Sequence, residues 1–131
     1  RRQSREQALQ TLYAREIQNT ALRKEGVAFS HPDGELSDYA RYLVDGVVTT
    51  LQSIDELLAG ALQNWKVSRL APIDRNVLRI AVFELNAEER EPVNVIINEA
   101  LELTKSFAPP KAVKFDHGVL DRANEIIEER S

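Results

Sequence analysis

Apolar residues recur every three to four positions along most of this chain, which is the spacing of helices with one buried face. The Val, Ile and Thr residues mostly follow the same spacing instead of alternating with polar residues, which argues against a β-sheet. Proline and glycine, which interrupt helices, are few. The pattern therefore predicts an all-α protein.

The start of the first helix is predicted from a capping-box pattern. Ser4 followed by Gln7 is typical of a helix start, although the two arginines that open the chain could extend the helix by one turn. One buried stripe is then expected, formed by Ala8, Leu9, Leu12, Tyr13 and Ile17. The polar segment at residues 24–37 is predicted to be a loop, with room for a short helix at residues 27–29.

A near-heptad pattern of apolar residues runs through residues 38–65. Ser53 and Glu56 form a second capping-box pattern inside it, which predicts either two helices or one bent helix. A coiled coil is the alternative interpretation. The stretch has fewer than four heptads and contains Gly46 and Gly60, and both features favour a bundle.

Prolines mark the boundaries of the remaining helices. Pro72 and Pro92 each fit the first turn of a helix, where the missing N–H costs nothing. Pro109 and Pro110 are expected to stop the second of these helices, and a last helix should run over about residues 111–128. The prediction is a compact bundle of about seven helices, which could divide into two small helical subdomains at the connection before Pro72.

Composition narrows the functional classes. The chain has 131 residues, 43% of them apolar and 29% charged, which fits one domain over residues 1–131. Cysteine is absent, so disulfides, thiol catalysis and thiolate metal sites are excluded. His31 and His117 lie far apart, and no phosphate-binding loop or nucleophile motif is found. We therefore expect no catalytic residue, metal or cofactor.

No apolar run approaches the roughly 20 residues that cross a bilayer, so a cytoplasmic protein without a membrane partner is predicted.

The net charge of −4 is unevenly distributed: residues 1–24 carry six basic and two acidic side chains. A basic end on an acidic body is typical of nucleic-acid binding through one patch. The alternative is that these arginines only solvate a helix start. Arg1 and Arg5 continue the stripe of Leu9, and this end of the stripe is expected to leave the core.

A second candidate surface surrounds Phe115. Basic residues flank it on both sides: Lys105, Lys111, Lys114 and Arg122. A phenylalanine among lysines suits single-stranded RNA, because an unstacked base can lie on the ring while the cations bind phosphates. The alternative is that Phe115 packs in the core and the lysines solvate a loop.

Four stretches form a distinctive ordered set: Ser4-Arg5-Glu6-x-Ala8-Leu9-x-x-Leu12-Tyr13, Asp74-Arg75-x-x-Leu78-Arg79-Ile80-Ala81-x-x-Glu84-Leu85, Ile97-Asn98-Glu99-Ala100-x-Glu102-Leu103-x-Lys105-x-Phe107 and Lys114-Phe115-x-x-Gly118-Val119-Leu120-Asp121. Together they resemble the NusB family of bacterial transcription antitermination factors. The resemblance covers about residues 1–123, and the loop at 24–37 is its weakest part.

This resemblance implies about seven helices in two small subdomains. It also implies that the protein pairs with NusE, a small-subunit ribosomal protein, and that the pair binds the boxA element of nascent RNA. Within the RNA polymerase antitermination complex, the pair then promotes read-through, chiefly in ribosomal RNA operons.

The resemblance also assigns roles to single residues. It implies NusE contacts at Asp74 and Arg75, and a packing role for Asn98 and Glu99. It implies RNA contacts at Arg1, Arg2, Arg5, Tyr13, Lys111, Lys114 and Phe115.

The chain departs from the family pattern just before Gly118. Many members have a short apolar residue and an asparagine where this chain has Asp116 and His117. Asp116 is expected to place a negative charge beside the RNA surface. An alternative function is the N-terminal RNA-binding domain of a ribosomal RNA cytosine methyltransferase, in which case the reading frame would continue past Ser131. The sequence leaves open whether the protein is a monomer or a homodimer.

Overall fold

The computed structural model describes residues 1–18 and 35–130, and this part of the chain is helical without a β-strand. Its elements are α1 (Arg2–Gln18), α3 (Asp38–Thr49), α4 (Leu51–Ala61), the short 3-10 helix η1 (Val67–Arg69), α5 (Pro72–Leu85), α6 (Val93–Phe107) and α7 (Ala112–Glu129). The all-α prediction is confirmed. The predicted loop and its short helix at residues 27–29 fall mostly outside the described residues.

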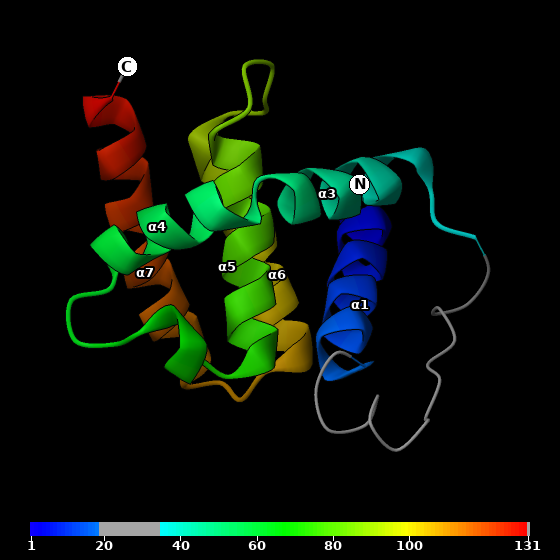
Figure 1. The fold of residues 1–131 in the computed structure, drawn as a ribbon, viewed down its shortest axis with the longest axis horizontal. Coiled ribbons are helices and arrows are strands. Elements are labelled where there is room, and N and C mark those ends of the chain that lie inside the picture. Colours follow the sequence, from blue (N-terminus) through cyan, green and yellow to red (C-terminus); the bar gives the residue numbers. More distant parts are fainter. Residues whose placement is uncertain (19–34, 131) are drawn as a thin grey trace.

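Helix α5 is the centre of the fold. It packs against α1, α3, α4, α6 and α7, and in Figure 1 α3 and α4 run across the other helices. Two of its buried residues are polar, Asn76 and Glu84, and the others are apolar: Val77, Leu78, Ile80, Ala81, Val82 and Leu85. One continuous apolar core contains residues from α1 and from every helix from α3 to α7. No helix in the described ranges is long and apolar enough to cross a membrane.

Prolines fixed helix boundaries as expected. Helix α5 begins at Pro72, Pro92 is the residue that precedes α6, and α6 ends at Phe107 before the two prolines.

The predicted break in the near-heptad stretch is confirmed, but it lies at Thr50 and not at Ser53. The Thr50 hydroxyl donates to the carbonyl of Gly46, so the last turn of α3 is closed before α4 begins.

The predicted capping box at Ser4 has a different role. Helix α1 begins two residues earlier, at Arg2. The Ser4 hydroxyl lies 2.7 Å from that of Ser37, and the Gln7 side chain accepts from the Ser37 N–H at 3.0 Å. Ser37 in turn caps α3 by accepting from the Ala40 N–H. The polar pair on α1 therefore positions the start of a neighbouring helix.

Candidate nucleic-acid interface

The basic start of α1 is largely neutralised by carboxylates. Arg5 is 2% exposed and donates to both carboxylate oxygens of Glu84, at 2.9 and 2.7 Å. It also donates to Glu91 at 2.8 Å, and the Tyr39 hydroxyl donates to Glu84 at 2.6 Å. Burial lowers the pKa of Arg5, but the hydrogen bonds and charge of Glu84 outweigh burial and raise it above its ordinary value. Arg5 is therefore a buried cation with its counter-charge in place.

The expectation that Arg5 leaves the core is wrong. The stripe of Leu9 stays buried at its basic end because Glu84 of α5 provides a carboxylate inside the core. Glu84 lies four residues after Ile80, so helical spacing puts it on the buried side of α5. A carboxylate at such a position was the signal in the sequence that a cation from elsewhere in the chain is buried beside it. The guanidinium of Arg5 is not presented to a ligand.

Arg1 and Arg2 are accessible but paired. The guanidinium of Arg1 lies 4.1 Å from the centre of the Tyr39 ring and donates to Glu91 at 3.1 Å. Arg2 donates to both oxygens of Glu99, at 3.1 and 2.7 Å, and this bond holds the pKa of Glu99 below its ordinary value. A phosphate group binding here would have to compete with these carboxylates.

The surface around Phe115 is different in charge. Lys111 and Lys114 are exposed and make no ion pair within the described ranges. Phe115 is half-buried: one side packs against the core, and its ring meets that of Trp65 edge to face, with centroids 6.4 Å apart. Trp65 is 56% exposed, the largest value among the large apolar side chains of the described residues. This surface therefore combines unpaired cations with accessible aromatic rings.

Asp116 does not lie on this surface. It is completely buried, and its Oδ2 accepts from the Thr104 hydroxyl of α6 at 2.9 Å. Burial raises its pKa to about 8, and a hydrogen bond with Asp74 of α5 adds to the shift. Because the carboxyl group is buried, it does not present the negative charge that was expected beside the RNA surface. His117 is exposed and lies 3.4 Å from Asp121.

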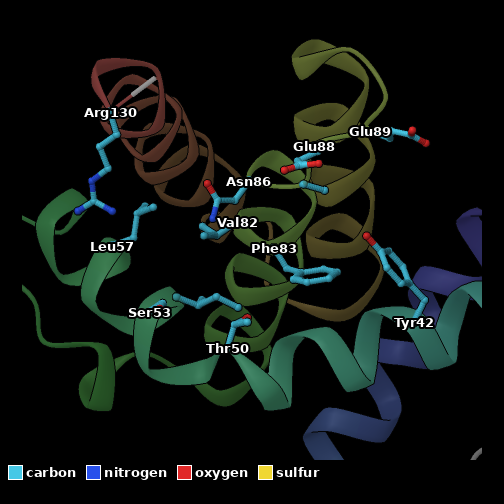
Figure 2. A pocket seen from close by; sticks show the side chains of 12 residues that line it. Tyr42, Thr50, Ser53, Leu57, Val82, Phe83, Asn86, Glu88, Glu89 and Arg130 are labelled. Atoms are coloured by element: carbon cyan, nitrogen blue, oxygen red, sulfur yellow. The ribbon is translucent and has the colours of Figure 1, made fainter.

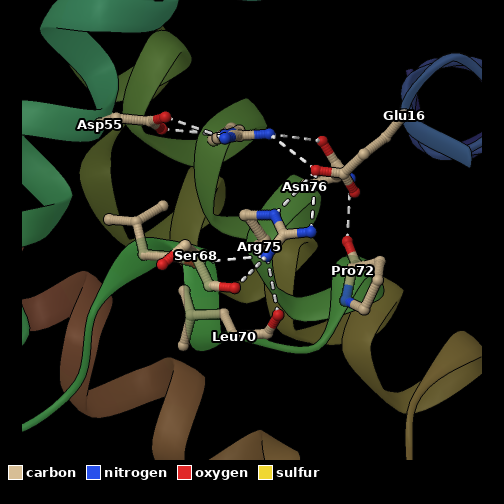
Figure 3. Close-up of polar contacts among 9 residues, drawn as sticks. Glu16, Asp55, Ser68, Leu70, Pro72, Arg75 and Asn76 are labelled. Carbon is tan, nitrogen blue, oxygen red and sulfur yellow. Dashed lines mark hydrogen bonds and ion pairs between the residues drawn. The ribbon is translucent and has the colours of Figure 1, made fainter. Parts of the chain in front are cut away.

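The start of α5 is fixed by a polar network (Figure 3). Arg75 forms an ion pair with Glu16 of α1 at 2.8 Å and donates to three carbonyls, those of Val67, Ser68 and Leu70. Its side chain is only 12% exposed. These bonds hold η1 and the following turn against α5, so the guanidinium positions the backbone here.

Glu16 is shared with a second arginine. Arg79 approaches Glu16 at 3.5 Å and forms a two-pronged pair with Asp55 of α4, both bonds being 2.9 Å. Asn76 donates to the second oxygen of Glu16. The network therefore ties α1, α4 and α5 together beside the residues for which a NusE contact was expected.

Another groove, of about 470 Å³, has no excess of basic over acidic side chains in its lining (Figure 2). Its lining runs from Tyr42 and Phe83 at one end to Arg130 at the other, with Glu88 and Glu89 at the side. The Phe83 ring lies directly on Gly46, where any Cβ would come within 2.1 Å of it. Glycine thus permits α3 to approach α5, and this face offers no match for an anion.

The sequence model of the NusB family matches residues 2–125. The chain belongs to the NusB family. Its relatives include the transcription antitermination protein NusB of Bacillus velezensis, 42% identical over 130 residues with 98% of both chains covered. The protein of the same name from Bacillus subtilis is 38% identical over 129 residues, again with 98% of both chains covered.

Solved NusB structures share the fold. A structure of T. maritima NusB aligns with a TM-score of 0.78 at 32% identity, covering 95% of this chain and 89% of the other. The antitermination factor NusB, crystallised with NusE and double-stranded RNA, aligns with a TM-score of 0.74 at 24% identity, covering 95% and 96%. At 24% identity, the comparison with this second structure shows only that the fold is shared.

The structure brings some of the predicted site residues together and separates others. Lys114 and Phe115 share one surface of α7, and Lys111 directly precedes that helix. Tyr13 is 37% exposed on α1, at a distance along that helix from the paired arginines. Trp65 was missed, because its apolar character assigned it to the near-heptad core pattern. In the structure Trp65 lies beyond Ala61, where α4 ends, so the helical spacing does not extend to it.

Proposed function

We propose that this chain is a transcription antitermination factor that binds boxA-type single-stranded RNA together with NusE. In this role it promotes read-through by RNA polymerase in ribosomal RNA operons, in the cytoplasm where bacterial transcription takes place. It acts by binding and not by catalysis. The named relatives, which match over nearly their whole length, support this assignment.

One observation carries the assignment of the RNA surface. The three arginines at the start of α1 are paired with Glu84, Glu91 and Glu99, whereas Lys111 and Lys114 beside Phe115 make no ion pair within the described ranges. Unpaired cations can neutralise phosphates without first losing a salt bridge. We therefore place the main RNA contact on Lys111, Lys114 and Phe115, with Arg1 and Arg2 as secondary contacts and Tyr13 as an accessory one.

The test is RNA binding measured over a range of salt concentrations, with and without NusE. Replacing Lys111 and Lys114 by alanine should weaken binding and reduce the salt slope by about 1.4, since each lost phosphate contact with a single strand removes about 0.7. Arg41, an exposed cation of α3, is the matched control, and Arg41→Ala should leave the slope unchanged. An unchanged slope in the lysine variant would place the RNA surface elsewhere.

The NusE contact is proposed at the start of α5, around Asp74 and Arg75. Because the Arg75 guanidinium is committed to Glu16 and to backbone carbonyls, we propose that it shapes this surface and that neighbouring exposed atoms make the contact. The methyltransferase-domain alternative has a direct test, which is whether the reading frame continues past Ser131 into a methyl-donor-binding domain. The relatives named above are antitermination proteins, and this favours the first function.

A further inference from the structure

A surface groove of about 420 Å³ lies between the segment that follows α4 and the first half of α7. The rings of Trp65 and Phe115 both line it and meet edge to face, at an interplanar angle of 81°. Lys114 and Arg122 of α7 also line it. The groove thus has aromatic walls and two cationic side chains at its edge.

Gly118 lies in the same groove and is not explained by packing. A Cβ built on Gly46 would strike the Phe83 ring, and one on Gly60 would touch Ile126 at 3.4 Å, but one on Gly118 would meet nothing within 4 Å. Glycine inside a helix is less stable than alanine because it loses more backbone entropy on folding. Helix α7 therefore gives up stability at a point where, in the described structure, only open space faces the backbone.

We propose that Trp65, Phe115 and Gly118 form a pocket for one unstacked base of single-stranded RNA, and that Lys114 and Arg122 bind the phosphates on either side. The proposal rests on the RNA-binding function and assigns its base-binding site. An unpaired base can stack on the face of one ring, and aromatic rings bind bases in this way with little regard to sequence. Gly118 leaves room for the base to approach the helix closely.

The cations at the groove are available to phosphate. Lys114 makes no ion pair in the described ranges, and Arg122 pairs only with Glu125 of its own helix at 3.2 Å. Both partners of that pair are about half exposed or more, and such pairs are weak and readily exchanged. A strand crossing the groove would therefore meet two cations of α7 beside the rings.

Tryptophan fluorescence reports on this site directly, because Trp65 is the only tryptophan in the sequence. Its intrinsic fluorescence should change when a single-stranded boxA RNA binds, and the same sequence supplied as a duplex should produce little change. Binding is followed in parallel by the anisotropy of a labelled RNA, with and without NusE. If the RNA binds and the Trp65 fluorescence stays constant, the pocket is wrong while the proposed function stands. If no RNA binds in either condition, the function itself fails.

Glycine variants separate binding from folding. Gly118→Ala should keep or raise the melting temperature, because alanine favours the helix, and yet should weaken RNA binding several-fold by entering the pocket. Gly118→Leu should weaken it further. Gly60→Ala, the same change in α4 where the new Cβ makes only an ordinary contact, is the matched control and should leave RNA binding unchanged. Equal RNA affinity of Gly118→Leu and the unmodified protein would overturn the proposal.

Loss of the tryptophan ring completes the test. Trp65→Ala should reduce RNA affinity roughly 5- to 150-fold, the range found when a stacking ring is removed, and Trp65→Phe should restore most of it. Because the side chain is more than half exposed, the melting temperature should change little. Rescue by leucine as effective as rescue by phenylalanine would show a general apolar contact, such as one with a protein partner, and would exclude base stacking.

Discussion

The carboxyl groups of Asp116 of α7 and Asp74 of α5 interact across the interface between their helices. Asp116 is fully buried, and each of the two carboxyl groups has a buried Oδ1 that finds no donor among other side chains or the backbone. Two carboxylates cannot donate to one another, so the bond between them requires that one stays protonated. Burial, with Asp74 adding to it, raises the pKa of Asp116 to about 8. The raised pKa favours Asp116 as the group that keeps the proton in the folded protein.

This pair predicts that stability falls as the pH rises from about 5 to 8. The folded protein keeps the Asp116 proton up to about pH 8, whereas the unfolded chain loses it near its ordinary pKa. In this window the folded state binds more protons, so the free energy of unfolding decreases by at most about 1.4 kcal/mol per pH unit. Urea denaturation at several pH values measures the slope.

Asp116→Asn is the matched variant for this prediction. Its amide N–H can donate to Asp74 and its oxygen can accept from Thr104 without any titration. We expect the decline between pH 5 and 8 to disappear and the variant to be more stable than the unmodified protein at pH 8. Below pH 5 the free energy of unfolding should change with pH at the same slope in both proteins, because the lowered pKa values of Glu91 and Glu99 are common to both. Identical pH profiles across the whole range would contradict a shared proton.

The buried pair of Arg5 and Glu84 predicts a stability defect and not a selective RNA defect. Arg5→Ala should cost about 3–5 kcal/mol, because it leaves the Glu84 carboxylate buried without its cation. Arg2→Ala, at an exposed pair, is the control and should scarcely alter the melting temperature. Replacing Arg5 and Glu84 together by methionine and leucine should recover much of the loss. A normal melting temperature combined with weak RNA binding in Arg5→Ala would show that this arginine contacts RNA after all.

These two buried groups show what the sequence could and could not predict. Helix boundaries at Pro72, Pro92 and Phe107 depend on a few neighbouring residues, and local patterns predicted them. The burial of Arg5 depends on a partner 79 positions away, and no local pattern reports which distant carboxylate a fold brings to it. Asp116 was assigned to the surface because a free carboxylate is charged, but in the structure it is buried with the Thr104 hydroxyl as its donor, and burial raises its pKa.

The same distinction applies to the candidate site. Charge and residue type were enough to predict a surface of Lys111, Lys114 and Phe115, because all three lie within one short stretch of sequence. Trp65 reaches Phe115 only through the packing of α4 against α7, which periodicity does not specify. The polar pair Ser4 and Gln7 was read as a local cap for a similar reason, although it acts on α3.

Arg75 is predicted to affect the NusE surface through the backbone that it holds. Arg75→Ala should lower stability by about 2 kcal/mol or more, because it removes a charged hydrogen-bond donor from Glu16 and from three carbonyls. Arg75→Lys should rescue little, since an ammonium group cannot span these acceptors as a planar guanidinium does. Thermal unfolding and calorimetry with NusE measure both effects. Reduced NusE affinity without any loss of stability would instead show a direct contact.

Phe115 is half-buried, so its two functions can be separated by the choice of substitution. Phe115→Ala should lower both stability and RNA affinity, because one side of the ring packs against the core and the other faces the groove. Phe115→Leu keeps most of the apolar volume and should cost less than about 1.5 kcal/mol of stability. Leucine offers no aromatic face, so the RNA affinity should still fall by about 1–3 kcal/mol, with NusE binding intact. RNA affinity that follows stability through both variants would show that Phe115 acts on RNA only by supporting the fold of α7.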